Sequence, residues 1–404
     1  MHKFLQTNPL FVKLTSILLF SKIGDRLFYT ALLSSATLTA HSDLAVMLVS
    51  LSETLPLLFG FILGTFADRC PNKTLRLVQA GWIRTLIYLG IGLIFDDPVT
   101  LTLIITVTLL NFCSDLGGVY STALITPFTK ILVPTTEMQQ AQGFLSIGTQ
   151  LFNVLATFLG SFLLIFISSR QLALVNACIF LIVTLSFQRL SSNLLTHQHE
   201  LPEQAKVSLG KALRQNLHTL YHDRLLFSIL IQLTLLNGFF GGLTPLFALL
   251  AKDSQQLIKL ALPLKLALLS GVITVAMILG DLYCTKLFAK ISLHQLALLA
   301  DILVVFSAGA FFLQNIYLIL VTSGVAAFLL GIIAPRFSAQ ILNTFAVTQL
   351  GGITAIINSC LVIMPPLTSL LFPLLANFGL AYPGLIIYSG ILVTSSLLNN
   401  GARN

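Results

Sequence analysis

Long apolar runs separated by short polar segments dominate this chain. A helix needs about 20 apolar residues to cross about 30 Å of hydrocarbon. Twelve such runs can be placed, at residues 10–35, 44–66, 76–95, 99–125, 139–167, 171–190, 225–250, 266–287, 293–313, 316–335, 341–373 and 379–398. The runs are much longer than a barrel strand of about ten residues, so they predict helices. Ala334-Pro335-Arg336 is the only clear break between the tenth and eleventh runs. The pattern predicts an all-α polytopic membrane protein with 12 transmembrane helices.

The longest polar stretch lies near the middle of the chain, with six predicted spans on each side. This layout predicts two repeated six-helix bundles with a substrate site between them near the bilayer midplane. We expect residues 1–190 to form an N-terminal bundle, 191–224 a cytoplasmic linker and 225–404 a C-terminal bundle. The linker carries regularly spaced leucines among basic residues, which predicts either an amphipathic helix on the inner membrane surface or a solvated connector. These residues are Leu209, Leu213, Leu217 and Leu220, with Lys206, Lys211, Arg214 and His218.

Composition supports the membrane class and gives an orientation. The chain is 56% hydrophobic and only 9% charged, which excludes an ordinary soluble domain. Its net charge of +8 is explained by topology. With the N-terminus inside, four basic residues face out (Arg170, Lys252, Lys259 and Lys265), three lie in spans (Lys22, Arg26 and Arg84), and the other fifteen lie on inner segments. The positive-inside rule then predicts a multi-pass protein of the cell membrane with both termini cytoplasmic, and no nucleic-acid partner.

Sites for metals, cofactors or enzymatic chemistry are not indicated. The five cysteines are scattered without a C-x-x-C pair, and His197, His199 and Glu200 in the linker do not complete a four-ligand metal site. The sequence contains no G-x-x-x-x-G-K-[ST], H-E-x-x-H or G-x-S-x-G motif. We therefore expect no enzyme, no ATP drive within this chain, no metal and no cofactor.

The segment between the second and third predicted spans is the most specific motif. Residues 64–73 read Gly-Thr-Phe-Ala-Asp-Arg-Cys-Pro-Asn-Lys. This segment resembles motif A of the major facilitator superfamily, roughly G-x-x-x-D-R-x-G-R-K, whereas Pro71 and Asn72 depart from it. The matching residues are Gly64, Asp68, Arg69 and Lys73. The resemblance implies a gating role, in which the aspartate pairs with basic and backbone donors and latches the inner gate. The alternative is a positive-inside loop with one incidental aspartate.

A weaker echo of this motif lies between the eighth and ninth predicted spans. Residues 280–290 retain a glycine, an acid and two lysines: Gly280, Asp281, Lys286 and Lys290.

A narrower resemblance concerns three other segments. Residues 21–26, 126–134 and 212–216 are similar to exporters of the macrolide-efflux and enterobactin-exporter type, which are drug:proton antiporters. This resemblance implies proton-driven export of a bulky amphipathic compound. Related exporters often carry a basic residue in the fourth span, whereas here the region reads Asn111-Phe112-Cys113-Ser114-Asp115.

A few ionisable residues lie within the predicted spans, where they are costly and mark a functional site or a buried pair. They are Lys22, Asp25, Arg26, Glu53, Arg84, Asp115 and Asp301. The proton-coupling candidates are Asp25, Glu53 and Asp115, and their basic partners are Arg26 and Arg84. Helical spacing allows Asp25 to pair with Lys22, and Arg84 is expected to pair with an inner-side acid. The alternative is that these groups only hold the N-terminal bundle together.

Neutral polar residues in the spans are candidates for lining the substrate cavity, although each can instead only join helices. They are Asn111, Tyr120, Gln150, Asn153, Gln232, Asn237, Asn343 and Asn358. Two glycine and proline groups predict breaks in the seventh and eleventh helices, with a static kink as the alternative. These groups are Gly238, Gly241, Gly242 and Pro245, and Gly351, Gly352, Pro365 and Pro366.

These patterns together predict a secondary active transporter that works by alternating access. We expect proton-coupled efflux of an amphipathic drug-like or natural-product compound by a multidrug antiporter. The expected partners are a small-molecule substrate, protons and membrane lipids, and the chain is expected to be a monomer. Two alternatives stay open: an importer or a lipid or metabolite carrier of the same fold, and a non-transporting receptor on a carrier scaffold.

Overall fold

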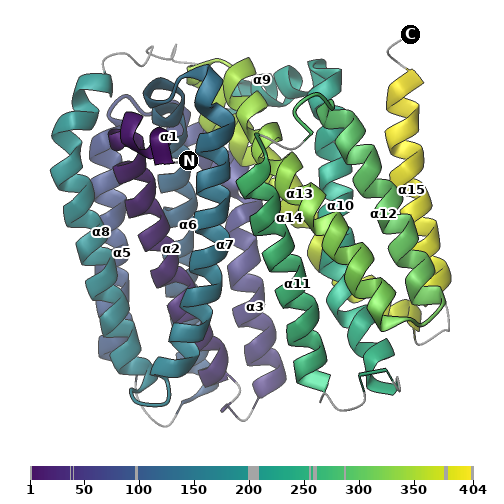
Figure 1. The fold of residues 1–404 in the computed structure, drawn as a ribbon. Coiled ribbons are helices and arrows are strands. Elements are labelled where there is room, and N and C mark those ends of the chain that lie inside the picture. Colours follow the sequence, from purple (N-terminus) through teal and green to yellow (C-terminus); the bar gives the residue numbers. More distant parts are fainter. Residues whose placement is uncertain are drawn as a thin grey trace. The chain divides into compact units, whose positions relative to one another are not determined.

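Helices account for all regular structure in the residues that the computed structural model describes, which are 2–36, 38–39, 41–95, 99–198, 209–253, 256–257, 262–285, 288–376 and 381–401 (Figure 1). The elements are α1 (His2–Thr7), α2 (Pro9–Ala36), α3 (Ser42–Leu58), α4 (Gly60–Asp68), α5 (Lys73–Ile94), α6 (Leu101–Leu132), η1 (Thr135–Glu137), α7 (Met138–Leu163), α8 (Ser169–Gln198), α9 (Leu209–His222), α10 (Arg224–Asp253), α11 (Leu262–Tyr283), α12 (Leu293–Phe312), α13 (Ile316–Thr344), η2 (Val347–Gln349), α14 (Leu350–Ala376) and α15 (Ala381–Gly401). The prediction of an all-α polytopic fold is confirmed.

Ten stretches of the described helices are long and apolar enough to cross a membrane. They coincide with ten of the twelve predicted spans. The first predicted span is α2, which has 28 residues but concentrates the charges Lys13, Lys22, Asp25 and Arg26. The last is α15, whose apolar stretch is the shorter Gly384–Thr394. The chain is therefore a multi-pass membrane protein whose first long helix is unusually rich in charge.

The predicted break at Ala334-Pro335-Arg336 is wrong, because α13 continues through these residues to Thr344. The guanidinium group of Arg336 finds carbonyl acceptors in the segment between α11 and α12. Its Nε donates to the carbonyl of Cys284 at 2.6 Å, and its Nη1 donates to the carbonyl of Phe288 at 3.1 Å. The break lies instead at residues 345–346, ahead of η2 and α14.

The predicted breaks in the seventh and eleventh spans are also wrong, because α10 and α14 are continuous helices. Their glycines serve close packing between helices. A Cβ atom on Gly241 would overlap Pro365, and one on Gly242 would overlap the ring of Phe372. At the same contact, the hydroxyl of Thr368 donates to the carbonyl of Gly238 at 2.5 Å.

The chain divides into two compact units. Unit 1 comprises Met1–Met138, Gly148–Leu217 and Leu342–Ser359, and unit 2 comprises Gln139–Ile147, His218–Ile341 and Cys360–Asn404. The core of unit 1 lies between α2, α5 and α8, where Tyr88 stacks on Phe180 with ring centroids 5.0 Å apart and meets Phe28 edge-on. This core holds the helices that carry the embedded charges. The domain division at residues 190 and 224 stays a prediction.

The linker forms a helix where the leucine spacing predicts one. This helix is α9, in which Leu220 is buried and Leu217 is exposed. Its position on a membrane surface stays a prediction. Several residues singled out from the sequence lie outside the described part of the chain: His199, Lys206, Lys259 and Lys286.

Candidate functional site

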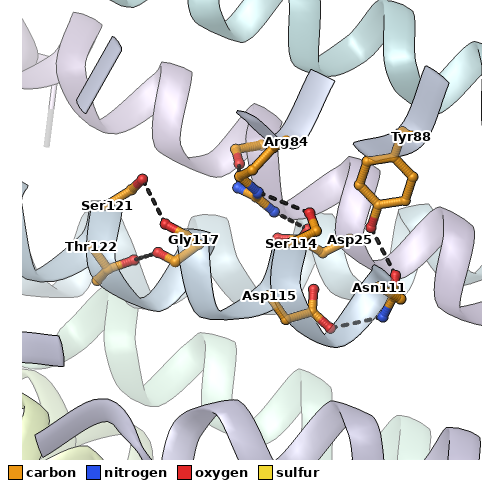
Figure 2. Close-up of polar contacts among 11 residues, drawn as sticks. Asp25, Arg84, Tyr88, Asn111, Ser114, Asp115, Gly117, Ser121 and Thr122 are labelled. Carbon is orange, nitrogen blue, oxygen red and sulfur yellow. Dashed lines mark hydrogen bonds and ion pairs between the residues drawn. The ribbon is translucent and has the colours of Figure 1, made fainter. Parts of the chain in front are cut away.

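Six ionisable residues form a charge cluster within unit 1: Lys22, Asp25 and Arg26 on α2, Glu53 on α3, Arg84 on α5 and Asp115 on α6. Two ion pairs organise it. Arg26 pairs with Glu53, and Arg84 pairs with Asp25, as Figure 2 shows for the second pair. The cluster has three acids and three bases, so its formal charges balance when all six groups are ionised.

Arg84 is the buried centre of this cluster. Its Nε donates to the hydroxyl of Ser114 at 3.2 Å and its Nη1 to the hydroxyl of Ser21 at 2.9 Å, in addition to the ion pair with Asp25. Its guanidinium carbon lies 4.0 Å from the centre of the Phe180 ring, which adds a cation–π contact. A buried guanidinium needs such a complete shell because an unpaired charge in the interior is strongly unfavourable.

The expected partners of Arg84 and Asp25 are therefore corrected. Arg84 lies halfway along α5 and pairs with Asp25 in the middle of α2, not with an acid at the inner end. Asp25 makes its ion pair with Arg84 and not with Lys22, whose Nζ donates to Thr149 on α7 at 3.2 Å. The i, i+3 spacing puts Lys22 and Asp25 near each other on α2, but Asp25 pairs with Arg84 on the neighbouring helix α5.

The two ion pairs differ in solvent access. The side chains of Arg26 and Glu53 are 35% and 33% exposed, whereas that of Arg84 is 4% exposed. Arg26 also lies over the ring of Tyr29, 5.6 Å from its centre. Water or a ligand can therefore reach the Arg26–Glu53 pair, while the Arg84–Asp25 pair is accessible only from the Asp25 side.

Asp115 is the carboxylate of the cluster that makes no ion pair among the described residues. Its Oδ2 accepts a hydrogen bond from Asn111 at 2.8 Å, and the Oδ1 of Asn111 accepts one from the hydroxyl of Tyr88 at 2.8 Å (Figure 2). The charges of Asp25, Arg84, Glu53 and Arg26 all act on it. Asp115 thus has a neutral hydrogen-bond partner and charged neighbours of both signs.

Asp68 forms the second feature of unit 1. It ends α4, is 6% exposed and accepts hydrogen bonds from the backbone amides of Gly351 at 2.7 Å and Gly352 at 2.6 Å. These amides belong to the first turn of α14, where N–H groups lack partners inside the helix and favour an anion. We call this arrangement the Asp68 contact.

Glycines make the Asp68 contact sterically possible. A Cβ on Gly64 would overlap the carbonyl of Gly351, and a Cβ on Gly351 would lie 2.5 Å from the Oδ1 of Asp68. The side-chain amide of Asn216, on α9, fills the space that a Cβ on Gly352 would need. The linker helix therefore packs directly against the residues that hold Asp68.

Lys73 completes the end of α4. Its Nζ donates to the carbonyls of Ala67 and, at 3.0 Å, of Asp68. A cation at a helix C-terminus satisfies carbonyls that have no helical partner and interacts favourably with the helix dipole.

The segment that echoes this motif makes a related contact in unit 2. Asp281 is buried, and its Oδ2 accepts a hydrogen bond from Ser146 on α7 at 2.8 Å. The thiol of Cys284 lies 3.7 Å from the carbonyl of Gln139 at the start of the same helix. In both segments an aspartate bonds to the early turns of a distant helix, but here the donor is a side chain instead of backbone amides.

Residues 14–313 match the family described as the Major Facilitator Superfamily. The chain belongs to the major facilitator superfamily. A member of this family is a transporter and not an enzyme. No curated protein sequence matches this major facilitator protein significantly.

Solved transporters share the fold of this major facilitator protein. A bacterial homologue of the iron transporter ferroportin, in an outward-facing state with soaked iron, aligns with a TM-score of 0.72 and 14% identity over 96% of this chain and 97% of that one. The E. coli fucose:proton symporter FucP gives 0.65 and 14% over 98% of each chain. The human organic anion transporter MFSD10 gives 0.66 and 13% over 96% of this chain and 99% of that one. At such low identity these likenesses establish the fold alone.

The neutral polar candidates in this major facilitator protein are dispersed. Asn111 joins the Asp115 network, and Tyr120 and Cys70 line one groove on unit 1. Gln232 is fully buried in unit 2, and its side-chain amide has no hydrogen-bond partner among the described residues. Asn343 and Asn358 are exposed, and the half-buried residues are Gln150, Asn153 and Asn237.

The sequence patterns did not predict the two serine hydroxyls that accept hydrogen bonds from Arg84. Ser21 precedes Asp25 by four residues on α2, and Ser114 directly precedes Asp115 on α6. The position of Ser21 follows from helical spacing once Asp25 is chosen, because residues four apart share a helix face. Asp301, a further ionisable residue of the predicted spans, is fully buried in α12 of unit 2.

Proposed function

We propose that this major facilitator protein is a proton-coupled antiporter that exports an amphipathic drug-like or natural-product compound by alternating access. The observation that carries the proposal is the balanced charge cluster, in which Asp115 makes no ion pair among the described residues. The resemblance to macrolide-efflux and enterobactin-type exporters supports export as the direction and an amphipathic compound as the substrate.

Proton binding would act through Arg84. Desolvation favours the neutral form of a buried carboxylate, whereas a nearby guanidinium favours its charged form. Arg84 pairs with Asp25 and also bonds to Ser114, the neighbour of Asp115 in the chain. Protonation of Asp25 would therefore release Arg84 toward Asp115, and protonation of Asp115 would favour the pairing that the structure has. Asp25 and Asp115 thus compete for Arg84, and protonation of one carboxylate favours the pairing of Arg84 with the other.

The same geometry would compensate for the absence of a basic residue from the fourth span. From Leu101 to Thr129, α6 carries no Lys or Arg. The guanidinium of Arg84 reaches α6 from the neighbouring α5 and bonds to Ser114. Arg84 would then perform from the third span the coupling role that related exporters assign to a fourth-span residue.

The exposed Arg26–Glu53 pair is the proposed point of contact with substrate. Both side chains are about one-third exposed, so a ligand with a charged or polar group can exchange with either partner. An amphipathic compound would present its polar group to this pair. Separation of the pair would change the charges that act on Asp115 and link substrate binding to proton binding.

The Asp68 contact is the proposed gate. A hydrogen bond to a charged group contributes about 1.5–3 kcal/mol. The two bonds of Asp68 therefore hold α4 against α14 but are weak enough to break in a conformational change. Separation of α4 from α14 at this gate would require Asp68 to lose its hydrogen bonds to the amides of Gly351 and Gly352.

Transport in proteoliposomes tests the proposal. Counterflow and efflux of hydrophobic cations, macrolides and siderophores are measured with and without an imposed pH gradient, with an internal dye reporting proton flux. We expect one compound class to move against its gradient when the pH gradient is imposed, with a stoichiometric proton flux in the opposite direction. Asp115→Asn should abolish this coupling and retain substrate counterflow.

Asp223→Asn is the matched control. Asp223 lies outside the long helices and accepts a hydrogen bond from the amide of Leu226, a role that asparagine also performs at a helix start. This variant should keep full coupling. Movement of substrate and protons in the same direction would make the protein an importer, and a panel in which no compound and no proton moves would overturn the transport proposal.

A further inference from the structure

A groove of about 700 Å³ lies on unit 1 beside residues 69–71. Its walls are α4 and α5, and both helices pack against α6, which forms its floor. The residues from α5 are spaced as one helix face: Arg76, Gln79, Ala80 and Ile83. The segment from Cys113 to Tyr120 of α6 supplies a second face at the same spacing. Two continuous helix faces therefore line the groove, and the loop between α4 and α5 adds Arg69, Cys70 and Pro71.

The groove is cationic at one end and apolar at the other. Arg69 and Arg76 line it, and neither makes an ion pair among the described residues. The Nη1 of Arg76 donates to the side chain of Gln79 at 3.0 Å, and Arg76 is exposed. Phe66 and Ile83 line the same groove and are 48% and 58% exposed. Along α5, Arg76 and Ile83 are about 10 Å apart at 1.5 Å per residue.

We propose that this groove binds an anionic membrane phospholipid, with its headgroup phosphate on Arg69 and Arg76 and an acyl chain along Phe66 and Ile83. Guanidinium groups bind phosphate oxygens in bidentate geometry, and basic pockets between transmembrane helices suit acidic headgroups. A free phosphate would satisfy the arginines but leave the apolar wall uncovered. The combination of two cations and an adjoining apolar strip therefore selects a lipid.

The single tryptophan of the chain is next to a groove residue in the sequence and provides a readout. Trp82 is 40% exposed and precedes Ile83 on α5. The full chain is reconstituted into phosphatidylcholine nanodiscs that contain phosphatidylglycerol or phosphatidylcholine with brominated acyl chains, which quench tryptophan on contact. We expect brominated phosphatidylglycerol to quench Trp82 at lower mole fractions than brominated phosphatidylcholine. Because these interactions are partly screened by salt, raising the salt concentration to about 0.5 M should reduce the difference in quenching between the two lipids.

Arg76→Gln tests the headgroup contact. Arg76 is exposed, so the variant should fold, and one basic residue near a membrane surface changes the relative affinity for an acidic lipid about five-fold. The expected result is a loss of the phosphatidylglycerol preference by about this factor. Arg189→Gln, which removes an exposed arginine from α8 outside the groove, should keep the preference.

Three results would overturn the proposal. They are equal quenching by the two brominated lipids, an equal loss in Arg76→Gln and Arg189→Gln, and displacement of brominated phosphatidylglycerol by millimolar inorganic phosphate. The last result would assign the arginines to a free anion. None of these measurements depends on transport, so the lipid proposal and the antiporter proposal can fail separately.

Discussion

The Oδ1 atom of Asp68 lies 2.7 Å from the backbone nitrogen of Gly351, although 283 positions separate the two residues in the sequence. The contact joins the end of α4 to the first turn of α14. Its strength comes from a carboxylate that faces helix amides without partners inside their own helix.

Asp68→Asn should weaken this contact. Asparagine keeps one carbonyl oxygen but replaces the other acceptor with an NH₂ group, which cannot accept from the second amide. A loss of about 1.5–3 kcal/mol corresponds to roughly 10- to 150-fold faster amide exchange. Hydrogen–deuterium exchange of the peptide containing Gly351 and Gly352 measures this change. Asp281→Asn, in the segment of unit 2 that echoes the motif, should leave that peptide unchanged.

Gly64→Ala should disrupt the same contact by steric means alone. Its Cβ would overlap the carbonyl of Gly351, so α4 and α14 must separate. The exchange of Gly351 should then accelerate even though Asp68 is intact. Gly90→Ala is the control on α5, where a Cβ meets no atom within 4 Å, and it should stabilise the protein by up to about 1 kcal/mol in a thermal-shift assay. Unchanged exchange in Gly64→Ala would contradict the close approach.

Arg84→Gln should destabilise unit 1 by about 3 kcal/mol, because it leaves Asp25 without its ion-pair partner. The double variant Arg84→Gln/Asp25→Asn should recover part of this loss, since no uncompensated charge remains. Equilibrium unfolding in mixed micelles gives both values. Arg26→Gln should change stability by less than about 1 kcal/mol, because its pair with Glu53 is about one-third exposed. Equal effects of the two arginine substitutions would show that burial does not distinguish the pairs.

Ser146→Ala should increase the chemical accessibility of Cys284. Ser146 donates to Asp281, and Cys284, which is 2% exposed, follows three residues later against the start of α7. Loss of one hydrogen bond removes about 1 kcal/mol and should raise the maleimide labelling rate of Cys284 about five-fold. Mass spectrometry of labelled peptides provides the rate for each cysteine. Cys70, in unit 1, should react at an unchanged rate.

The sequence predicts helices well in this chain because hydropathy is a local property. The twelve expected runs match described helices or helix pairs, and the charged residues of α2 explain why its hydropathy is weaker. The choice of Arg84 as an embedded partner also follows from the sequence. Its pairing with Asp25 does not, because the choice between Lys22 and Arg84 depends on the distance between helices.

Glycine and proline are the residues whose structural role the sequence alone does not determine. The same Gly241 that favours a bend in an isolated helix lets α10 approach Pro365, and only the neighbouring helix decides between these roles. Pro335 similarly fits inside α13, where the next residue, Arg336, finds carbonyl acceptors outside the helix. Motif A is recognisable from four residues, but the amides that bind its aspartate, those of Gly351 and Gly352, lie in a segment that the sequence indicates as a hinge.

The balance of the charge cluster has an electrical consequence. Three acids and three bases sum to zero, and one added proton makes the cluster +1. A full elementary charge that crosses the membrane field gains or loses about 2.3 kcal/mol per 100 mV. In the proposed antiporter, the proton-loaded cluster would therefore respond to membrane voltage while the empty one would not, and a resting potential would act on only one half of the transport cycle.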